Sequence, residues 1–509
     1  MDQPLSAAQA DACYRALQTH DARFDGRFFT GVTSTGVYCR PVCRVRTPLR
    51  QNCRFFDLAA QAEAAGFRPC LRCRPELAPQ AQAWSIQDAS ATLAQQAARL
   101  LDNPEAFSSA VGVQALADRL GVSDRHLRRI FEARFGVTPL QYLQTRRLLT
   151  AKQLLTDTDL PVTQVGLMSG FASLRRFNAA FAQHYGMAPS ALRRDGAERR
   201  TSPTRATGPV TRLGYRPPYD EGAMLRFLAQ RAVPGMEWVD VAALRVGRSL
   251  SLRGADGQWH HGWLSFAFEP DRHRVSLQVG DTLRAVLPAL IHRVRAWLDL
   301  DADPVAINAV LHAHFPDGDG LRVPGGLDGF ELAVRAVLGQ QVSVAAARTF
   351  ATRLVTHFGA PVDTPWPEVT RAFPTPAALA QADGDALGAL GIVRQRQAAI
   401  TALARAVDAG QLNLQPGADV PSTLTALQAL PGIGAWTAHY IALRALRWAD
   451  AFPAGDVALH NALGVRGERQ PARAAEAASQ AWRPWRAYAV IRAWAAGTTA
   501  PTTPEKASP

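Results

Sequence analysis

The chain has 509 residues, a net charge of +13 and a pI near 10.1. This length exceeds what one hydrophobic core fills and predicts three or four domains of roughly 150 residues each. The composition is globular, with 47% hydrophobic and 19% charged residues, and it contains no apolar run long enough to cross a membrane and no secretory signal pattern. These features argue against a membrane protein. We expect a cytoplasmic protein whose positive charge favours an anionic polymer as its partner.

The first predicted feature is a metal site built from two close cysteine pairs, Cys39 with Cys43 and Cys70 with Cys73. Tetrahedral zinc takes four thiolates, and two short turns can each supply two of them without strain. All six cysteines lie at or before Cys73, which argues against a disulfide framework in so long a chain and indicates metal binding in a reducing compartment. Spacing alone favours a purely structural zinc site. The alternative is that one thiolate also reacts.

Arginine is concentrated around these cysteines. The same segment contains Arg40, Arg44, Arg46, Arg50, Arg54, Arg68, Arg72 and Arg74. A positive field of this kind suits a phosphate backbone. The remaining cysteines, Cys13 and Cys53, are expected to be ordinary thiols.

Two helix-turn-helix units are predicted next. In the first, between Val113 and Phe135, two short helices meet at Gly121 and Ser123 caps the second helix. In the second unit, about fifty residues further on, Ser173 has the capping position. A reader of the major groove needs basic side chains at the start of each second helix. The candidates are Arg125, Arg128, Arg129, Arg175 and Arg176.

The two units, joined by a long helix predicted from Pro139 to about Leu155, resemble the DNA-binding domain of AraC-type regulators. Each unit ends in an aromatic residue, then glycine, then proline at matching offsets, as Phe135-Gly-Val-Thr-Pro and Tyr185-Gly-Met-Ala-Pro. Helix-turn-helix geometry also occurs in proteins that bind no DNA. Two units in tandem on a basic chain nevertheless favour DNA binding.

The cysteine segment closely resembles the N-terminal domain of the Ada adaptive-response proteins over about residues 6 to 80. The matching motifs are Thr35-Gly-Val-Tyr-Cys39 and Ala65-Gly-Phe-Arg-Pro-Cys70. In that family the first cysteine takes a methyl group from a methyl phosphotriester in DNA. The resemblance therefore implies that Cys39 is both the methyl acceptor and a zinc ligand, with Cys43, Cys70 and Cys73 as the other ligands. Methylation would remove a negative charge from the site and strengthen DNA binding.

A helix-hairpin-helix motif is predicted in the C-terminal half at Leu430-Pro-Gly-Ile-Gly-Ala-Trp436. Gly432 and Gly434 permit the tight turn and bring backbone amides against a phosphate. Alone, this motif is a common nonspecific DNA-binding element. About twenty residues later Asp456 follows a Gly/Pro turn. This pairing resembles the helix-hairpin-helix base-excision glycosylases, in which the aspartate is catalytic.

The resemblance extends to the AlkA-type 3-methyladenine DNA glycosylases II over about residues 211 to 498. It rests on motifs such as Tyr215-Arg-Pro-Pro-Tyr-Asp and Phe330-Glu-Leu-Ala-Val-Arg. It implies that Asp456 stabilises an oxocarbenium-like sugar and activates water, while aromatic rings hold a flipped cationic base. The aromatic residues at the matching positions are Trp436, Tyr440 and Trp494. A lone aromatic residue at helical spacing more often packs in a core, and this alternative is strongest for Trp436.

Two positions depart from the AlkA pattern. Gln341 stands where that family has a leucine wedge, which fills the gap left by the flipped base. Val457 replaces an aromatic residue after the aspartate. We expect Gln341 to intercalate into DNA and the base site to be looser.

The scarcity of lysine bears on the reaction. Related glycosylases that also cut the DNA strand use a lysine just after the hairpin glycines, where this chain has Trp436, and its lysines are Lys152 and Lys506. The enzyme is therefore predicted to be monofunctional and to leave an abasic site. Because no cysteine follows Cys73, the second methyltransferase domain usual in Ada-type proteins is not expected.

The expected fold class is multidomain. It consists of a small α+β zinc domain (residues 1–82), an all-α tandem helix-turn-helix domain (83–195), a linker (196–210), an α+β antiparallel-sheet domain (211–320), an all-α helix-hairpin-helix glycosylase domain (321–498) and a disordered tail (499–509). The polar, turn-rich linker composition favours halves that function largely independently.

The predicted function is a response to alkylation damage that combines methyl transfer to a zinc-bound cysteine, methylation-switched transcription activation and excision of alkylated bases such as 3-methyladenine. The alternative is a zinc-containing transcription regulator whose C-terminal half only binds DNA. The expected cofactor is Zn²⁺. The expected partners are double-stranded DNA, alkylated bases and methyl phosphotriesters within it, promoter DNA and RNA polymerase, and we expect a monomer without membrane contact.

Overall fold

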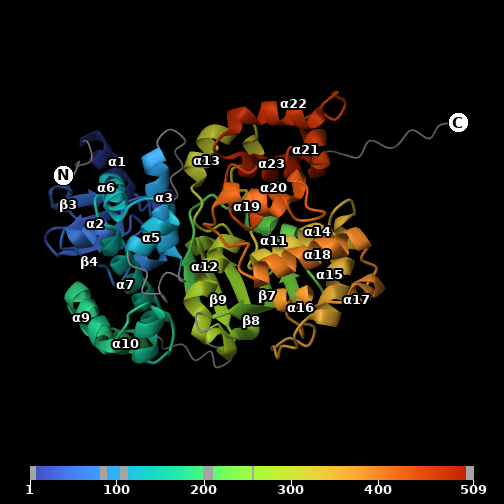
Figure 1. Ribbon diagram of the computed structural model, residues 1–509. Coiled ribbons are helices and arrows are strands. Elements are labelled where there is room, and N and C mark those ends of the chain that lie inside the picture. The colour runs from blue at the N-terminus through green and yellow to red at the C-terminus, as the bar shows by residue number, and fades with distance from the viewer. Residues whose placement is uncertain (1–6, 81–88, 104–112, 199–209, 255–256, 500–509) are drawn as a thin grey trace.

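The computed structural model describes residues 7–80, 89–103, 113–198, 210–254 and 257–499. Figure 1 shows two halves side by side, the N-terminal half (residues 7–198) on the left and the C-terminal half (residues 210–499) on the right. The predicted linker and tail lie outside the described residues except at their edges. Within the described ranges, no helix is long and apolar enough to cross a membrane.

The first module is a four-stranded sheet with helices packed on it. Strand β1 (Phe29–Val32) is antiparallel to β2 (Val37–Cys39) and to β3 (Cys53–Phe56), and β2 is parallel to β4 (Arg68–Pro69). Helices α1 (Ala7–Gln18) and α2 (Ala59–Ala64) contact the strands. Because β2 and β4 run in the same direction, the cysteines that follow them reach the same end of the sheet.

The second module is helical. Its helices are α3 (Ala89–Asp102), α5 (Val113–Arg119), α6 (Asp124–Phe135), α7 (Pro139–Asp157), α8 (Val162–Met168), α9 (Leu174–Tyr185) and α10 (Pro189–Glu198). The long helix expected from Pro139 is α7. The turn before α6 contains Gly121 with a φ of 68°, a left-handed conformation that favours glycine. Ser123 accepts a hydrogen bond from His126 N, and Ser173 accepts one from Arg176 N, so both predicted caps are present.

The third module is an antiparallel sheet with the strand order β5-β9-β8-β7-β6. Its strands are β5 (Val210–Gly214), β6 (Glu237–Asp240), β7 (Arg245–Arg253), β8 (Trp259–Glu269) and β9 (Arg274–Val279), and its helices are α11 (Glu221–Arg231) and α12 (Leu287–Trp297). Alternate residues of β9, Val275, Leu277 and Val279, are buried. This alternation is the pattern of a strand with one face in the core.

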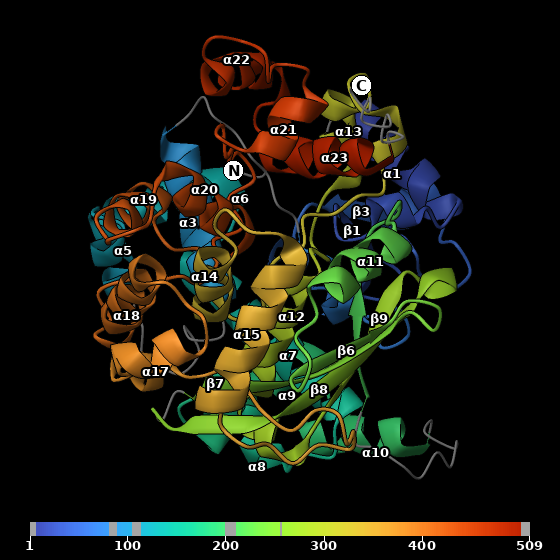
Figure 2. The same cartoon turned by 90° about the vertical axis from the view of Figure 1, so that its right-hand side faces the viewer.

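The fourth module is helical, and Figure 2 shows its last helices, α21 to α23, at the top of the view above the sheet. Its helices are α13 (Pro304–Leu311), α14 (Gly329–Leu338), α15 (Val344–Phe358), α16 (Pro376–Ala380), α17 (Gly384–Ala389), α18 (Arg394–Asp408), α19 (Val420–Gln428), α20 (Ala435–Arg444), α21 (Val457–Ala462), α22 (Pro471–Ala478) and α23 (Arg486–Thr499). The predicted multidomain architecture, with its zinc, helix-turn-helix, sheet and helix-hairpin-helix parts, is confirmed.

The hydrophobic cores do not follow the four modules one to one. A large core fills the fourth module, and a separate core fills the first helix-turn-helix unit. The second helix-turn-helix unit shares one continuous core with the sheet module, in which Leu154 and Phe177 belong to the same cluster as Leu213 and Phe266. The two halves of the chain are therefore packed against each other through apolar contact.

Candidate active site and metal centre

Asp456 stands at the start of α21, where it is the N-cap residue. Its extended backbone (φ −75°, ψ 122°) lets Oδ1 accept a hydrogen bond from Leu459 N at 2.7 Å. The preceding Pro453-Ala-Gly turn brings the chain out of the core to this position, and Asp456 N donates to Pro453 O at 2.9 Å. The residue is 9% exposed, so its carboxylate is nearly enclosed by protein.

Two tryptophan side chains hold the carboxylate on either side. Trp494 Nε1 donates to Asp456 Oδ1 at 3.0 Å, and Trp436 Nε1 donates to Oδ2 at 3.0 Å. The indoles come from α23 and α20, which are far apart in sequence. Hydrogen bonds from neutral donors stabilise the ionised form of a carboxylate and fix its orientation without neutralising it.

The three predicted aromatic residues form one cluster beside Asp456. The rings of Trp436 and Tyr440 are stacked, with centroids 5.3 Å apart and planes 20° apart, and those of Tyr440 and Trp494 are 6.2 Å apart. All three side chains are partly exposed. Trp436 therefore lies at the edge of the core, where it contacts Asp456, and is not packed inside the core. Such electron-rich faces can receive a flat cationic ring.

Sequence reasoning missed the charged residues behind this cluster. Arg444 Nη1 donates to Tyr440 Oη at 2.6 Å, and the Arg444 guanidinium also lies over the rings of Tyr440 and Phe227. Burial by itself would raise the pKa of Tyr440, but the guanidinium groups of Arg444 and Arg231 hold that pKa below its usual value. One clue was present in the sequence, since Trp436, Tyr440 and Arg444 follow each other at four-residue steps on one helix face.

The helix-hairpin-helix consists of α19, α20 and the turn between them. Gly432 has a φ of 73°, and a Cβ there would lie 3.2 Å from Ala399 Cβ, so both conformation and space favour glycine. At Gly434, the N-cap of α20, a Cβ would meet nothing within 4 Å. The backbone at the hairpin is consequently open to a ligand as large as a DNA phosphate.

Gln341 lies in the turn between α14 and α15, is exposed and has a left-handed φ of 55°. Its neighbour Gln340 was not singled out from the sequence. Gln340 Nε2 donates to Gly432 O and to Thr437 Oγ1, both at 2.9 Å, and Gln340 O accepts from Arg396. These contacts join the turn that contains Gln341 to the hairpin.

The four predicted metal ligands meet at one point. The Sγ atoms of Cys39, Cys43, Cys70 and Cys73 all lie within 4.8 Å of one another. Cys70 N donates to Tyr38 O at 2.9 Å, which ties the second pair to the end of β2. Two backbone amides point at sulfur, Arg40 N at Cys73 Sγ (3.3 Å) and Arg72 N at Cys70 Sγ (3.4 Å). Amide donors beside four converging sulfurs suit thiolates on a tetrahedral zinc ion, and Zn²⁺ is the cofactor of this domain.

Seven of the eight arginines around this site divide into two groups, and the eighth, Arg50, is partly exposed and paired with Asp11. Arg44, Arg46, Arg54, Arg68 and Arg72 are exposed, as expected of side chains that could meet DNA phosphates. Arg40 is instead buried in an ion pair with Asp25, and Arg74 forms ion pairs with Glu76 and Asp157. The expectation that all eight contribute to a surface field was too broad, because these two neutralise internal carboxylates.

The two cysteines outside the site remain thiols. Burial, with a smaller contribution from the charge of Asp57, raises the pKa of Cys13 to about 11. Burial likewise raises the pKa of Cys53, whose Sγ lies 3.4 Å from Leu49 O. Neither side chain is part of the four-sulfur cluster.

The predicted DNA-contacting arginines lie on the second helix of each helix-turn-helix unit. Arg125 and Arg129 on α6 and Arg175 and Arg176 on α9 are exposed. Arg128 differs, because it forms an i,i+4 ion pair with Asp124 through Nε at 2.9 Å. Its charge is therefore partly compensated within its own helix.

Four family models match the chain in the order of its modules. They are the metal binding domain of Ada (residues 12–76), a helix-turn-helix domain (116–195), the AlkA N-terminal domain (210–328) and the HhH-GPD superfamily of base excision DNA repair proteins (334–487).

Similar proteins cover both the whole chain and its halves. The "Probable bifunctional transcriptional activator/DNA repair enzyme AlkA" of Mycobacterium tuberculosis is 40% identical over 492 residues, which are 95% of this chain and 96% of that protein. The DNA-3-methyladenine glycosylase 2 of Escherichia coli is 38% identical over 47% of this chain and 82% of its own length. The regulatory protein ada of Salmonella typhimurium is 37% identical over 36% of this chain and 50% of its own length.

Proposed function

Since the chain belongs to the family of bifunctional transcriptional activators and DNA repair enzymes of the AlkA type, we propose that it responds to alkylated DNA with three activities. The C-terminal half excises alkylated bases such as 3-methyladenine, the zinc domain accepts methyl groups from phosphotriesters, and the tandem helix-turn-helix domain binds promoters. The observation that carries the first activity is the carboxylate of Asp456 between two indole N–H groups.

The excision chemistry requires little acid catalysis, because an alkylated purine is cationic and its glycosidic bond is already weakened. The carboxylate of Asp456 would stabilise the developing oxocarbenium sugar and can accept a proton from the attacking water. The rings of Trp436, Tyr440 and Trp494 would hold the extruded base, and Gln341 would occupy the gap in the DNA stack. Val457, which is 58% exposed next to Asp456, leaves that side of the site open.

Replacement of Asp456 by asparagine tests this assignment. Asparagine keeps the side-chain oxygen that caps α21, so the fold should persist while the charge is lost. We expect release of 3-methyladenine from methylated DNA to fall by at least a hundredfold with unchanged binding to undamaged DNA. Release at the wild-type rate would support instead a C-terminal half that only binds DNA, or a different catalytic group.

Within the described residues no lysine lies near Asp456, which supports hydrolysis without strand cleavage. Position 436, just after the hairpin glycines, is tryptophan, and Lys152 is buried in an ion pair in the other half. Treatment of the reacting mixture with borohydride should therefore trap no covalent enzyme–DNA adduct, and the product should be an intact strand with an abasic site.

Methyl transfer is assigned to Cys39. When bound, zinc keeps the four thiols deprotonated at neutral pH. Cys39 Sγ attacks the methyl carbon, the methyl carbon–oxygen bond breaks, and its electron pair goes to the phosphate oxygen, which becomes an ordinary phosphodiester anion. The sulfur becomes a thioether, and one negative charge leaves the site, which lowers repulsion of DNA phosphates. The reaction is stoichiometric, because a thioether has no easy route back to a thiolate.

Peptide mass analysis after incubation with methylated DNA tests this step. One methyl group should appear on the peptide that contains Cys39, and Cys53, a buried thiol in the same domain, is the matched control. A Cys39 peptide that stays unmodified would leave the zinc site with a structural role alone.

Activation of transcription implies RNA polymerase as a further partner. A monomer suffices for promoter binding, because the two helix-turn-helix units on one chain can read two adjacent segments of the groove without a second subunit. Sedimentation of the free and methylated protein, with and without promoter DNA, would detect a dimer if activation needs one.

A further inference from the structure

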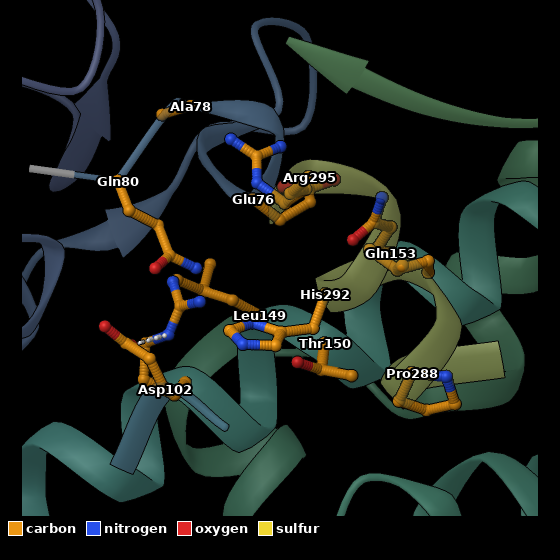
Figure 3. Close-up of a pocket in the computed structure, with 12 residues that line it drawn as sticks. Glu76, Ala78, Gln80, Asp102, Leu149, Thr150, Gln153, Pro288, His292 and Arg295 are labelled. Carbon is orange, nitrogen blue, oxygen red and sulfur yellow. Dashed lines mark ion pairs between the residues drawn. The ribbon is translucent and has the colours of Figure 1, made fainter. Parts of the chain in front are cut away.

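The contact between the two halves is built from buried polar groups as well as from apolar ones. Figure 3 shows the region, a cavity of about 50 Å³ lined by residues of both halves, among them Glu76, Gln80 and Gln153 from the first and His292 and Arg295 from the second. Direct hydrogen bonds cross the contact next to it. Gln80 N donates to Asp301 Oδ1 at 2.7 Å, and Gln153 Nε2 donates to Arg212 O at 3.2 Å.

Arg216, in the turn after β5, is the most enclosed charge of this contact, with 1% exposure. Its guanidinium donates to three carbonyl oxygens of the N-terminal half, those of Asp25 (2.7 Å), Pro79 (3.0 Å) and Gln80 (3.0 Å). It donates to two more in its own half, Asp301 O and Ala302 O. Burial lowers the pKa of Arg216 to about 10, so the group remains charged at neutral pH. Separation of the halves would remove three of its five acceptors, which is unfavourable for a buried cation.

Asp25 connects Arg216 to the zinc site. Its carbonyl oxygen accepts from Arg216, and its carboxylate accepts from Arg40 Nε at 2.8 Å and from Arg40 Nη2. Arg40 directly follows Cys39. Its backbone N donates to Cys73 Sγ, and its Nη1 donates to Cys73 O (2.9 Å) and to Arg74 O (3.4 Å). Three residues thus join two of the four sulfur ligands to the C-terminal half.

The packing around this chain of contacts has little freedom. A Cβ at Gly26, whose φ is 71°, would lie 2.0 Å from Pro79 O and 3.1 Å from Arg216. A Cβ at Gly214, in β5, would lie 2.5 Å from Leu77 O and 3.5 Å from Arg40. Gly26 and Pro79 belong to the same half, with the Arg216 side chain of the other half beside them, whereas Gly214 and Leu77 bring the backbones of the two halves into direct contact. A shift of one half at Gly214 must therefore move the other.

A second set of contacts connects a third sulfur ligand, Cys70, to strand β5. Lys152 Nζ donates to Cys70 O at 3.2 Å and is paired with Glu76. Glu76 also pairs with Arg74, which pairs with Asp157, and Asp157 Oδ2 accepts from Arg212 N in β5 at 3.3 Å.

We propose that the zinc site and the C-terminal half are structurally coupled through Arg40, Asp25 and Arg216, so that the zinc-loaded domain holds β5 in place and the two halves behave as one unit. The coupling goes beyond the proposed activities and does not depend on them. Its consequence is that loss of zinc from the N-terminal domain loosens a strand of the half that contains Asp456.

The test uses the full chain with a site-specific protease sequence placed in the 199–209 segment. After cleavage, the zinc-loaded protein should elute from a sizing column as one species of full mass. Zinc removal by a chelator should increase hydrogen exchange at the β5 amides (residues 210–214) at least tenfold and leave exchange in α15 unchanged. Arg216→Ala should make the cleaved halves elute separately, whereas Arg226→Ala, which removes an exposed arginine of the same module, should not.

Two results would overturn the proposal. One is elution of the cleaved, zinc-loaded wild type as two separate halves, and the other is β5 exchange that does not change when zinc is removed. If Arg216→Ala fails to fold, Arg27→Ala replaces it. Across the contact this variant removes the partly exposed ion pair with Asp303, and within its own half it removes a cation–π contact with Phe24. Arg27→Ala should weaken association of the cleaved halves at least threefold relative to the wild type. Association as strong as in the wild type would count against the coupling.

Discussion

At the scale of single residues, Asp456 combines two roles that sequence reasoning treats separately. It caps α21 through Oδ1, and both carboxylate oxygens accept indole hydrogen bonds. The resemblance to the helix-hairpin-helix glycosylases pointed to this residue through the Gly/Pro turn before it. The two tryptophan donors were expected as walls for a base, but their N–H groups also orient the carboxylate.

Trp494→Phe tests the indole hydrogen bond to Asp456 separately from the aromatic wall, because phenylalanine keeps an aromatic surface and removes the donor to Oδ1. A hydrogen bond to a charged group contributes about 1.5 to 3 kcal/mol, so excision should slow roughly ten- to a hundredfold. Single-turnover release of 3-methyladenine measures the change. Trp259→Phe, at an exposed position on β8, is the matched control. An unchanged rate in Trp494→Phe would show that the indole N–H does not act on the reacting carboxylate.

The arginines of the two recognition helices should contribute unequally to DNA affinity. Arg175→Ala removes an exposed charge and should lower the affinity for promoter DNA several-fold and reduce the slope of affinity against salt by about one. Arg128→Ala should have a smaller effect on both quantities, because Asp124 already compensates that charge. Titrations at several salt concentrations compare the two variants, and equal slopes would contradict this ranking.

At the scale of elements, the turn between α14 and α15 is positioned by a helix-hairpin-helix that lies about ninety residues away in sequence. Gln340 makes this connection with two side-chain hydrogen bonds of 2.9 Å to the hairpin. The turn presents Gln341 at a left-handed φ that is unusual for a residue with a side chain. The proposed wedge, Gln341, and the proposed phosphate-binding hairpin are thereby held at a fixed separation, at which both can engage DNA at the same time.

Gln340→Ala should therefore affect placement more than folding. Loss of two hydrogen bonds costs about 1 to 3 kcal/mol in unfolding free energy of the module, and excision should fall about tenfold because Gln341 is no longer held. Methyl transfer to Cys39 on the same chain provides an internal control and should be unchanged. If the variant excises bases at the normal rate and only its thermal stability falls, Gln340 is not needed to position the turn that contains Gln341.

At the scale of the whole molecule, the halves share a core and buried polar contacts. Linker composition favoured independent halves, yet α8, α9 and the sheet bury one continuous apolar cluster. Composition describes the residues between two domains and carries no information about the surfaces that they present to each other. Contact between those surfaces makes the stability of each half depend on the other.

Acidification should weaken this arrangement through His292, which lines the cavity between the halves. Burial lowers its pKa from 6.5 to about 4, and the nearby carboxylate of Asp301 only partly opposes this. Because the folded pKa lies below the unfolded one, the unfolded chain takes up a proton first, and stability falls as the pH drops from about 6.5 towards 4. At pH 5 the loss is about 2 kcal/mol. Melting temperatures at pH 7 and pH 5 for wild type and His292→Gln test this, and the same drop in both would assign the effect to other groups.

The sequence by itself determined several local features of this protein: the cysteine pairs, the serine-capped recognition helices, the glycine hairpin and the aspartate after its turn. Each of these features depends on residues only a few positions apart, as in a helix cap, a left-handed turn or the spacing of metal ligands. Such features can be predicted directly from the order of residues in the chain. The resemblances extended this to the modules and to Trp436, Tyr440 and Trp494.

Only the tertiary structure decided which groups meet across long separations. The indoles of Trp436 on α20 and Trp494 on α23 meet at Asp456 only in the folded chain, where Arg444 lies behind Tyr440. Arg40 is buried against Asp25 although it looks like one of several surface arginines. Hydrogen bonding and burial depend on distance in space, which the spacing along the chain does not encode. The contact of Arg216 with three carbonyls of the other half belongs to the same class, since nothing in its Tyr-Arg-Pro-Pro motif specifies a partner nearly two hundred residues away.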